Sequence, residues 1–357
     1  MNREIVLFIP SIERGGVEKN FFLITKFLQK KFKKIFIVTS NTNYKNQFNK
    51  NIQVICPNSF FWINKKRFLK TIISSILLIK NFYKKDVTIL SFQSNVYVIL
   101  IAKLLKFKII VRLNTSIKKY IKSNFKKFFF RLIYNLADKI IVNSIYFKKE
   151  VKSELKINSY LIYNSLEPSK LKKKLKFFEK YNGLKILNIG RLTDQKNHML
   201  LLKSLNLLRK EKVNFRCCII GDGYEKSRLK QYLVTNNLNK NVKLIGYKKN
   251  AKNYLSSCDL FVLPSKFEGL PNVLIEAQSR NIPIISSDCP TGPKEILLNG
   301  KLGDLFEVGN INELSNLIFK FSKNKIILKN KTKQAKKYLT RFDYKKNCEK
   351  YYRILSA

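Results

Sequence analysis

Two glutamates stand in a segment whose pattern is typical of a ligand-binding strand end. Glu268 and Glu276 belong to the stretch FEGLPNVLIE, which follows an apolar run over residues 260–263. Such a run predicts a buried strand, and the Gly-Leu-Pro after Glu268 predicts a turn into a helix. Phosphates bind where a strand end opens into a helix start, and a carboxylate accepts hydrogen bonds from two neighbouring hydroxyls. In this context we interpret both glutamates as ligands of a sugar or a ribose rather than as ordinary surface residues.

The stretch GRLTDQKNH supplies cations at a second predicted strand end. An apolar run over residues 184–189 precedes Gly190, and a helical pattern begins near Asn197. Between them lie Arg191 and Lys196. A guanidinium binds an anion through two parallel N–H hydrogen bonds, and an ammonium acts as a point charge. The two side chains together therefore suit a diphosphate. The alternative is two solvated cations in a very basic protein.

A third loop, PSIERGGVE, follows the first apolar run and contains Gly15 and Gly16. Its glycines lack the GxGxxG spacing of dinucleotide-binding loops. Two interpretations stay open. The loop is either a plain turn from strand to helix or a loop that faces an anion.

The charge of the chain is extreme and uneven. Its 357 residues include 71 Lys and Arg against 23 Asp and Glu. Residues 1–180 hold 38 basic and 9 acidic residues, a net charge of +29, whereas residues 181–357 hold 33 and 14, a net charge of +19. Such a balance favours anionic partners, namely phosphates, acidic membranes or nucleic acid. Compositional drift is the other explanation of the total, but it leaves the skew toward the first half unexplained.

The Cys and His residues of the sequence do not suggest a metal site or a set of disulfides. The six Cys residues include no CxxC pair, and His198 is the only His. We therefore expect neither a zinc site nor a disulfide framework. No DxD-like acidic pair follows a predicted strand, so we expect no cofactor and no obligatory metal ion.

The chain also lacks a membrane-spanning pattern. No run approaches the roughly 20 largely apolar residues of a transmembrane helix, and the first residues do not resemble a signal peptide. We expect a cytoplasmic protein.

Short apolar runs alternate with helical patterns along most of the chain, which predicts parallel sheets covered by helices on both faces. The alternation stops in a Lys-rich segment with Pro168 and Asn182-Gly183, and it restarts afterwards. The fold class is therefore α/β, with two doubly wound, Rossmann-like domains in series. The expected parts are an N-terminal domain over residues 1–165, a linker over 166–183, a C-terminal domain over 184–337 and a final helix over 338–357.

Several of these segments together resemble the retaining glycosyltransferases of family 4. They are GRLTDQKNH, FEGLPNVLIEA and the Gly-Asp-Gly at residues 221–223, with the glycine pair at 15–16 and DCPTGPKEI at 288–296 in support. The resemblance spans nearly the whole chain and is strongest over residues 184–305. The last segment resembles members that build polyprenyl-diphosphate-linked glycans or surface polysaccharides.

The resemblance implies a fold and an activity. The fold is GT-B, in which two Rossmann-like domains face a central cleft and the final helix crosses back to the first domain. The activity is transfer of a hexosyl or N-acetylhexosaminyl group from a nucleotide-diphosphate sugar to a glycan or a lipid-linked glycan. The N-terminal domain would bind the acceptor, and the C-terminal domain would bind the donor.

The resemblance also implies roles for individual residues. Arg191 and Lys196 would grip the donor diphosphate. Glu268 would hold hydroxyls of the donor sugar, and Glu276 would bind the ribose. Further contacts to the donor would come from Gly15, Gly16, Gly269, Leu270 and Asn272.

One departure from the family pattern concerns the base. Many relatives carry a His after the fifth strand, where this chain has Asn114. An Asn cannot replace a base, but it can hydrogen-bond a hydroxyl of the donor sugar. A retaining mechanism on one face needs no protein base, because the leaving phosphate can take the acceptor proton. The chemistry then depends on cations that stabilise the departing diphosphate.

Residues 117–137 interleave cations with aromatic residues, so this segment bears on membrane binding. At helical spacing the two kinds separate only in part, and two interpretations stay open: an interfacial helix, or an ordinary helix with a solvated basic side. In the first, the N-terminal domain docks peripherally on the inner, anionic face of the membrane and takes a lipid-linked acceptor there. Residues 60–85 would extend this surface. The cations are Lys118, Lys119, Lys122, Lys126, Lys127 and Arg131.

Two other functions compete with glycosyl transfer. The net charge of +48 is compatible with a nucleic-acid-binding protein, but the charge is diffuse and no RNA-binding signature is present. A sugar-nucleotide epimerase can share the fold, but it typically needs several acid and base side chains. The single His of this chain therefore argues against an epimerase. We therefore expect no nucleic-acid partner.

Overall fold

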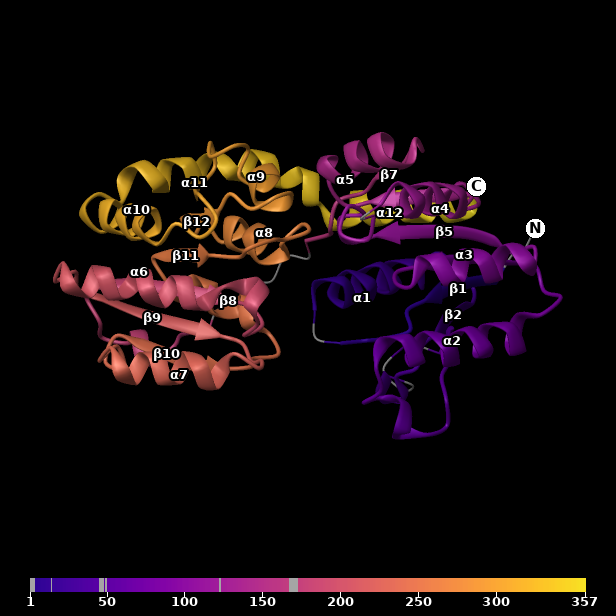
Figure 1. Cartoon of the computed structure of the whole chain (residues 1–357), viewed down its shortest axis with the longest axis horizontal. Coiled ribbons are helices and arrows are strands. Elements are labelled where there is room, and N and C mark those ends of the chain that lie inside the picture. The colour runs from indigo at the N-terminus through magenta and orange to yellow at the C-terminus, as the bar shows by residue number, and fades with distance from the viewer. Residues whose placement is uncertain (1–3, 14, 45–47, 49, 122, 167–172) are drawn as a thin grey trace. The chain divides into compact units, whose positions relative to one another are not determined.

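The computed structural model describes residues 4–13, 15–44, 48, 50–121, 123–166 and 173–357. The chain forms two compact units. The first comprises Met1–Ser165 together with the final segment Asp343–Ala357, and the second comprises Leu166–Phe342. Each unit contains one parallel sheet with helices packed on it (Figure 1).

The first unit is built on a seven-stranded parallel sheet in the order β3-β2-β1-β4-β5-β6-β7. β1 pairs directly with β4, so the strand order reverses between these two strands. All residues of β4 are buried, as expected for a strand covered on both faces. The strands are β1 (Glu4–Phe8), β2 (Ile35–Val38), β3 (Ile52–Ile55), β4 (Val87–Ser91), β5 (Lys108–Leu113), β6 (Lys139–Val142) and β7 (Tyr160–Leu161).

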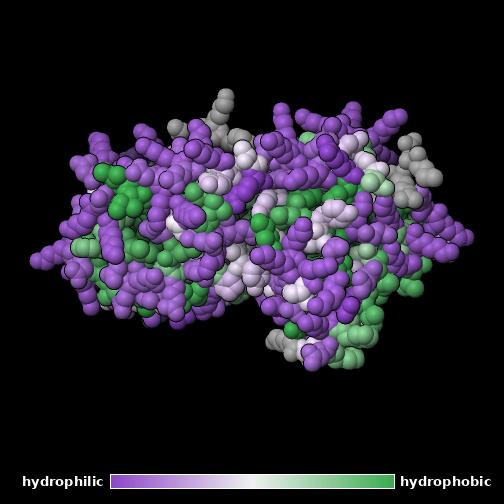
Figure 2. Space-filling model, turned by 90° about the horizontal axis from the view of Figure 1, so that it is seen from above, coloured by the Kyte–Doolittle hydropathy of each residue, from purple (hydrophilic) through white to green (hydrophobic). Residues whose placement is uncertain are grey.

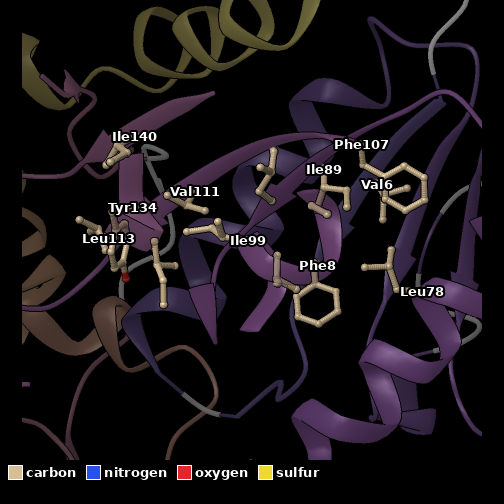
Figure 3. Packing of buried hydrophobic residues seen from close by; sticks show 14 of the residues in the cluster. Val6, Phe8, Leu78, Ile89, Ile99, Phe107, Val111, Leu113, Tyr134 and Ile140 are labelled. Carbon is tan, nitrogen blue, oxygen red and sulfur yellow. The ribbon is translucent and has the colours of Figure 1, made fainter. Parts of the chain in front are cut away.

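Helices cover both faces of this sheet. One face packs against α2, α3 and α4 through side chains such as Leu78, Ile99 and Tyr134, which meet Phe8 and Val111 of the strands (Figure 3). The other face packs against α1 and α12, so the last helix of the chain belongs to the first unit. The helices are α1 (Gly16–Leu28), α2 (Arg67–Phe82), α3 (Asn95–Leu104), α4 (Asn124–Asn135), α5 (Ile145–Glu150) and α12 (Tyr344–Ser356), with short helical turns η1 (Thr42–Tyr44), η2 (Phe60–Trp62) and η3 (Val151–Leu155).

The second unit is built on a six-stranded parallel sheet in the order β10-β9-β8-β11-β12-β13. Here the strand order reverses between β8 and β11. The strands are β8 (Leu184–Ile189), β9 (Phe215–Ile220), β10 (Val242–Gly246), β11 (Leu260–Leu263), β12 (Ile284–Ser287) and β13 (Asp304–Phe306). The helices are α6 (His198–Lys210), α7 (Lys226–Thr235), α8 (Asn272–Ser279), α9 (Gly292–Ile296), α10 (Ile311–Lys323) and α11 (Ile326–Tyr338), with short turns η4 (Lys176–Phe178), η5 (Asp194–Lys196), η6 (Ala251–Ser257) and η7 (Leu339–Phe342).

Capping residues move two expected helix starts. The helix expected from residue 117 begins only at Asn124, because Ser123 accepts a hydrogen bond from the Lys126 N–H at 3.3 Å. The final helix begins at Tyr344, because Asp343 accepts from the Lys346 N–H at 2.8 Å. No described helix is both long and apolar enough to cross a membrane.

Candidate active site

The carboxyl ends of β8 and β11 lie side by side at the reversal of strand order in the second sheet. The register pairs Leu187 of β8 with Phe261 of β11, so the segments that follow these strands leave the same edge of the sheet. One is the cation-bearing loop of residues 190–197 and the other is the Glu268 loop of residues 264–271. Ligands of doubly wound sheets bind at this kind of position.

Lys196 and Glu268 form an ion pair between these two loops. The Lys196 Nζ lies 2.5 Å from Glu268 Oε1, and the Ser265 hydroxyl donates to the same oxygen at 2.6 Å. The two charged side chains are only 16% and 7% exposed. Because the pair is shielded from water, removing one partner would leave a poorly compensated charge.

Three further contacts tie the same loops together. The Lys266 Nζ lies 2.5 Å from Asp194 Oδ1, and the Lys266 N–H donates to the Gln195 carbonyl at 2.9 Å. The Gln195 amide donates to the Phe267 carbonyl at 2.9 Å. The backbone contacts hold the loops in register, so the Lys196 and Glu268 side chains are positioned by more than their own attraction.

The loop after β12 fastens the Glu268 loop from the other side. The Thr291 hydroxyl donates to the carbonyls of Glu268 and Gly269, and the Gly292 N–H donates to Gly269 at 2.8 Å. A Cβ added to Gly292 would lie 2.0 Å from the Gly269 oxygen, so this approach requires glycine. Thr291 has φ of 90°, a conformation that β-branched residues rarely adopt. The backbone is therefore strained at a point that supports the Glu268 loop.

The loop after β9 packs against the cation-bearing loop. The Leu192 N–H donates to the Asp222 carbonyl at 2.9 Å, and a Cβ on Gly221 would lie 1.8 Å from the Gly190 oxygen. The first glycine of the Gly-Asp-Gly segment thus allows two backbones to meet. Loops after four neighbouring strands, β9, β8, β11 and β12, form one connected edge.

The two cations of this loop have different surroundings. Lys196 lies along Gly190, since a Cβ there would be 3.5 Å from the Lys196 Cγ and Cδ, and its ammonium reaches Glu268. The Arg191 side chain is exposed, and within the described chain its guanidinium makes no hydrogen bond or ion pair.

The other expected donor contacts lie at the start of α8. Asn272 is the first residue of this helix, and Pro271, with extended backbone, precedes it as the N-cap. Leu270 is buried, and Gly269 uses its carbonyl to accept the bonds from Thr291 and Gly292. Glu276 lies one turn into the helix and is 8% exposed.

His198 is unsuited to act as a base. It is 2% exposed, and no described residue hydrogen-bonds either ring nitrogen. Burial, with a smaller contribution from Lys196, lowers the pKa of His198 to about 3. It borders a pocket of about 310 Å³ whose lining includes Asp194, Lys203, Glu225, Arg228 and Lys266.

The first unit brings its own expected residues to the carboxyl edge of its sheet. Gly15 is the N-cap of α1 and Gly16 is its first residue. A Cβ on Gly15 would lie 2.6 Å from an oxygen of Glu18, which is buried and accepts from the Gln93 amide at 3.3 Å. Burial raises the pKa of Glu18. The loop is therefore packed against a carboxylate of its own helix.

Asn114 is held by its neighbours in the same unit. Its amide donates to the Phe92 carbonyl at 2.8 Å, and its oxygen accepts from the guanidinium of Arg112. Arg112 is 1% exposed and also donates to the Tyr351 hydroxyl at 2.7 Å and to Asn164 at 2.6 Å. Asn114 is half-buried, so it keeps an exposed side in a fixed orientation.

Sequence reasoning missed the residues that support the site. Ser265 and Thr291 hold Glu268 and its loop, and Gly292 permits the close approach. The Thr-Gly-Pro at the start of α9 is the available signal, since a glycine and a proline at a helix start mark a constrained turn. Among the described residues, no group of three or more His, Cys, Asp and Glu could hold a metal ion.

Two family models match consecutive parts of the chain. Residues 14–170 match the model described as Glycosyltransferase Family 4, and residues 169–338 match the model described as Glycosyl transferases group 1. The chain is a glycosyltransferase that resembles family 4.

The individual relatives are named as glycosyltransferases as well. The chain is 26% identical over 332 residues to the N-acetylgalactosamine-N,N'-diacetylbacillosaminyl-diphospho-undecaprenol 4-alpha-N-acetylgalactosaminyltransferase of Campylobacter jejuni, covering 87% of this chain and 88% of that protein. It is 36% identical over 207 residues to an uncharacterized glycosyltransferase of Methanocaldococcus jannaschii, covering 54% of this chain and 50% of that protein. The glycosyltransferase thus spans about half the length of the second relative.

A solved structure shares the fold. The crystal structure of Anabaena HepE in complex with UDP-glucose superimposes with a TM-score of 0.80 at 18% identity, and the match covers 99% of each chain. The chain therefore has the GT-B fold that its sequence implies. Neither a nucleic-acid-binding protein nor an epimerase finds support in these comparisons.

Proposed function

We propose that this glycosyltransferase moves a sugar from a nucleotide-diphosphate donor to a lipid-linked glycan acceptor, with retention of the anomeric configuration. The product would enter a cell-surface polysaccharide or a glycolipid. The Lys196–Glu268 pair at the strand-order reversal carries the proposal, because it joins a cation for phosphate to a carboxylate for sugar hydroxyls. The name of the Campylobacter relative specifies a diphospho-undecaprenol acceptor, and the HepE crystal contains UDP-glucose.

The proposed reaction takes place on one face of the donor sugar. The acceptor hydroxyl attacks the anomeric carbon as the bond to the donor phosphate breaks, and the hydroxyl proton passes to the departing phosphate oxygen. Lys196, Arg191 and the amino-terminal end of α8 stabilise the charge that develops on the diphosphate. Glu268 holds the hydroxyls of the reacting sugar, and Glu276 holds the ribose. No protein base is required, which fits the Asn at position 114.

We also propose that protein cations replace a metal ion and that the enzyme works at the inner face of a membrane. The first point rests on Arg191 and Lys196, which lie in one loop and neutralise phosphate without a divalent ion. The second rests on the chemistry of the acceptor, since a polyprenyl chain stays in the bilayer. Residues of the first unit, including Gly15, Gly16 and Asn114, would then face the acceptor or donor from their own sheet edge.

The test is turnover of Arg191→Ala and Lys196→Ala, with and without EDTA. Each change should lower turnover by about 10²-fold or more, because removing one preorganised donor to a developing oxyanion typically costs that much. Lys210→Ala, which removes an exposed lysine at the end of α6, is the matched control and should be as active as the parent. Melting temperatures identify any variant that loses activity by unfolding. Near-parental turnover of both loop variants, or complete loss in EDTA that one divalent ion restores, would refute the proposed clamp.

A further inference from the structure

Helix α2 turns an apolar stripe toward solvent, while the inward side of its first half is polar and only Leu78 and Phe82 of its second half enter the core. Its inward positions include Lys70, Thr71, Ser74 and Ser75, all of which are buried. Its outward positions follow at helical spacing and are large and apolar: Phe68 (58% exposed), Ile72 (41%), Ile76 (52%), Ile79 (39%) and Tyr83 (59%). A surface helix normally turns polar residues toward solvent, so something apolar is expected to cover this exposed stripe.

Helices α3 and α4 continue the exposed apolar surface. On α3 the stripe is Tyr97, Leu100 and Leu104, the last 83% exposed. On α4 the exposed apolar residues are Phe125 (78%), Phe128 (61%), Phe129 (47%), Leu132 (50%) and Leu136 (44%). Most exposed large hydrophobic side chains of the described chain lie between residues 60 and 136, all in the first unit.

The three stripes belong to one face. The rings of Phe68 and Tyr97 lie 6.1 Å apart, and the hydroxyls of Thr71 and Ser94 are 2.7 Å apart, so α2 adjoins α3. α3 packs against α4 in turn. The buried sides of all three helices enter the same core on the same side of the sheet, so their opposite sides point the same way (Figure 3). Figure 2 shows green patches exposed among purple ones on both halves of the molecule. We name the outward side of α2, α3 and α4 the α2–α4 face.

The charge around this face is almost wholly positive. Residues 57–137 contain 17 Lys and Arg and a single acidic residue, Asp86. Lys66 and Arg67 at the start of α2, and Lys126 and Arg131 on α4, are exposed beside the apolar stripes. Lys65 lies over the ring of Phe61 at 3.7 Å. Apolar side chains bordered by cations are typical of a surface that enters the headgroup region of an anionic membrane.

Two of the cations that the sequence suggests for membrane binding form ion pairs within the protein. Glu154 binds Lys127 at 2.8 Å and Lys118 at 3.5 Å, and the hydrogen bond from Lys127 lowers the pKa of Glu154. These two lysines are therefore partly neutralised within the protein. Lys122 lies outside the described residues.

We propose that the α2–α4 face docks on an anionic lipid bilayer. This deepens the proposed function, since a lipid-linked acceptor lies in such a bilayer. A second copy of the chain would bring a second set of like charges against the first, which favours lipid over self-association. The face also connects to the substrate-binding edge, because the buried Lys70 of α2 donates to the Ser11 hydroxyl at 3.5 Å, in the loop that leads to Gly15.

The experiment is vesicle flotation of the full-length enzyme. Vesicles contain phosphatidylcholine alone or phosphatidylcholine with about a third phosphatidylglycerol. The apolar variant is Phe68→Ser/Ile76→Ser/Phe125→Ser/Phe128→Ser, and the charge variant is Lys66→Gln/Arg67→Gln/Lys126→Gln/Arg131→Gln. The matched controls are Ile326→Ser/Ile327→Ser and Lys333→Gln/Lys336→Gln on α11, where the isoleucines are 65% exposed. Trp62, the only Trp of the chain, lies in η2 beside α2 and reports insertion through its fluorescence.

The parent and both controls should float with the anionic vesicles and not with phosphatidylcholine alone, and Trp62 emission should shift to the blue. Both face variants should bind at least tenfold more weakly, since each Lys or Arg near an anionic surface contributes about 1 kcal/mol and buried apolar groups add to it. Equal flotation of parent and face variants would overturn the proposal, as would a parent that does not float. The proposal would also be overturned if the parent proved to be a dimer and the face variants were monomers that bind vesicles as the parent does, because the face would then join two copies of the chain. Thermal shifts with nucleoside diphosphates on the same proteins separate the two proposals: intact nucleotide binding without flotation refutes the docking face alone.

Discussion

Lys196 and Glu268 were expected to hold different parts of the donor, yet they bond to each other at 2.5 Å. In the proposed function, a carboxylate for the sugar and a cation for the diphosphate are therefore adjacent, on either side of the bond that would break. Ser265 supplies a further donor to Glu268. Because the pair is well shielded, its charges act more strongly than they would in water.

The two glutamates should respond differently to neutralisation. Glu268→Gln is expected to lower turnover at saturating donor by 10²-fold or more, because in the proposed function Glu268 contacts the reacting sugar, and because the change weakens its bond to Lys196. Glu276→Gln should mainly raise the KM for the donor, because its proposed partner, the ribose, lies away from the reacting carbon. Steady-state kinetics of the two variants provide the comparison. Equal losses of kcat would contradict this division of roles.

His198 gives the protein a predictable sensitivity to acid. Its pKa is about 3 in the folded chain against an ordinary value of 6.5, so between these values the unfolded chain binds more protons. The free energy of unfolding must then fall as the pH falls through this range. His198→Leu removes the titration and should lose roughly 1–2 kcal/mol less stability than the parent between pH 7 and pH 5. Urea unfolding at the two pH values measures this, and identical losses would show that His198 titrates normally.

At the scale of elements, the site depends on loops that grip one another. The segments after β8, β9, β11 and β12 are joined by backbone hydrogen bonds, and the strained Thr291 and the close-packed Gly292 lie at the last junction. The strands fix the ends of each loop, and the hydrogen bonds between loops fix the residues in the middle of each loop. Such support keeps charged side chains in one geometry.

Gly292→Ala should damage catalysis through this junction. Its Cβ would collide with the Gly269 oxygen, forcing the Glu268 loop to move, so turnover should fall at least tenfold. Gly309→Ala is the control. Gly309 has φ of 92° but no atom within 4 Å of an added Cβ, so that change should cost about 1–2 kcal/mol of stability and leave turnover unchanged. Matching activities of the two variants after correction for folded fraction would argue against the junction.

The sequence predicts the buried strands well, because runs such as residues 260–263 are apolar throughout and end in glycine or proline turns. It predicts α11 and β13 poorly. After Ile326 and Ile327 the helix α11 is rich in lysine, and both isoleucines are exposed, so no apolar stripe marks its buried side. β13 has three residues. Residues 251–257 form the 3-10 segment η6 rather than an α-helix.

The same limit applies to the site. The motifs locate Lys196 and Glu268, because each follows a recognisable strand end. Their bond joins positions 72 residues apart, and only the adjacency of β8 and β11 creates it. Likewise, the grip of Thr291 on the Glu268 loop follows from the order of strands in the sheet rather than from any local pattern.

At the scale of the whole molecule, the two units carry different surfaces. The first holds most exposed apolar side chains and the larger share of the positive charge, and the second holds the connected loops with Lys196 and Glu268. This division matches the proposed division of labour, in which one unit meets the membrane and its lipid-linked acceptor and the other holds the donor.

The most direct test of the central claim is transfer itself. The purified glycosyltransferase is incubated with a panel of radiolabelled nucleotide sugars and a bacterial extract of polyprenyl-diphosphate-linked glycans, and label is measured in the lipid fraction. One donor should label this fraction with its anomeric configuration retained, and Glu268→Gln should reduce the rate by 10²-fold or more while the protein stays folded. If no donor supports labelling, if the anomeric configuration is inverted, or if Glu268→Gln transfers as fast as the parent, the account of this site is wrong.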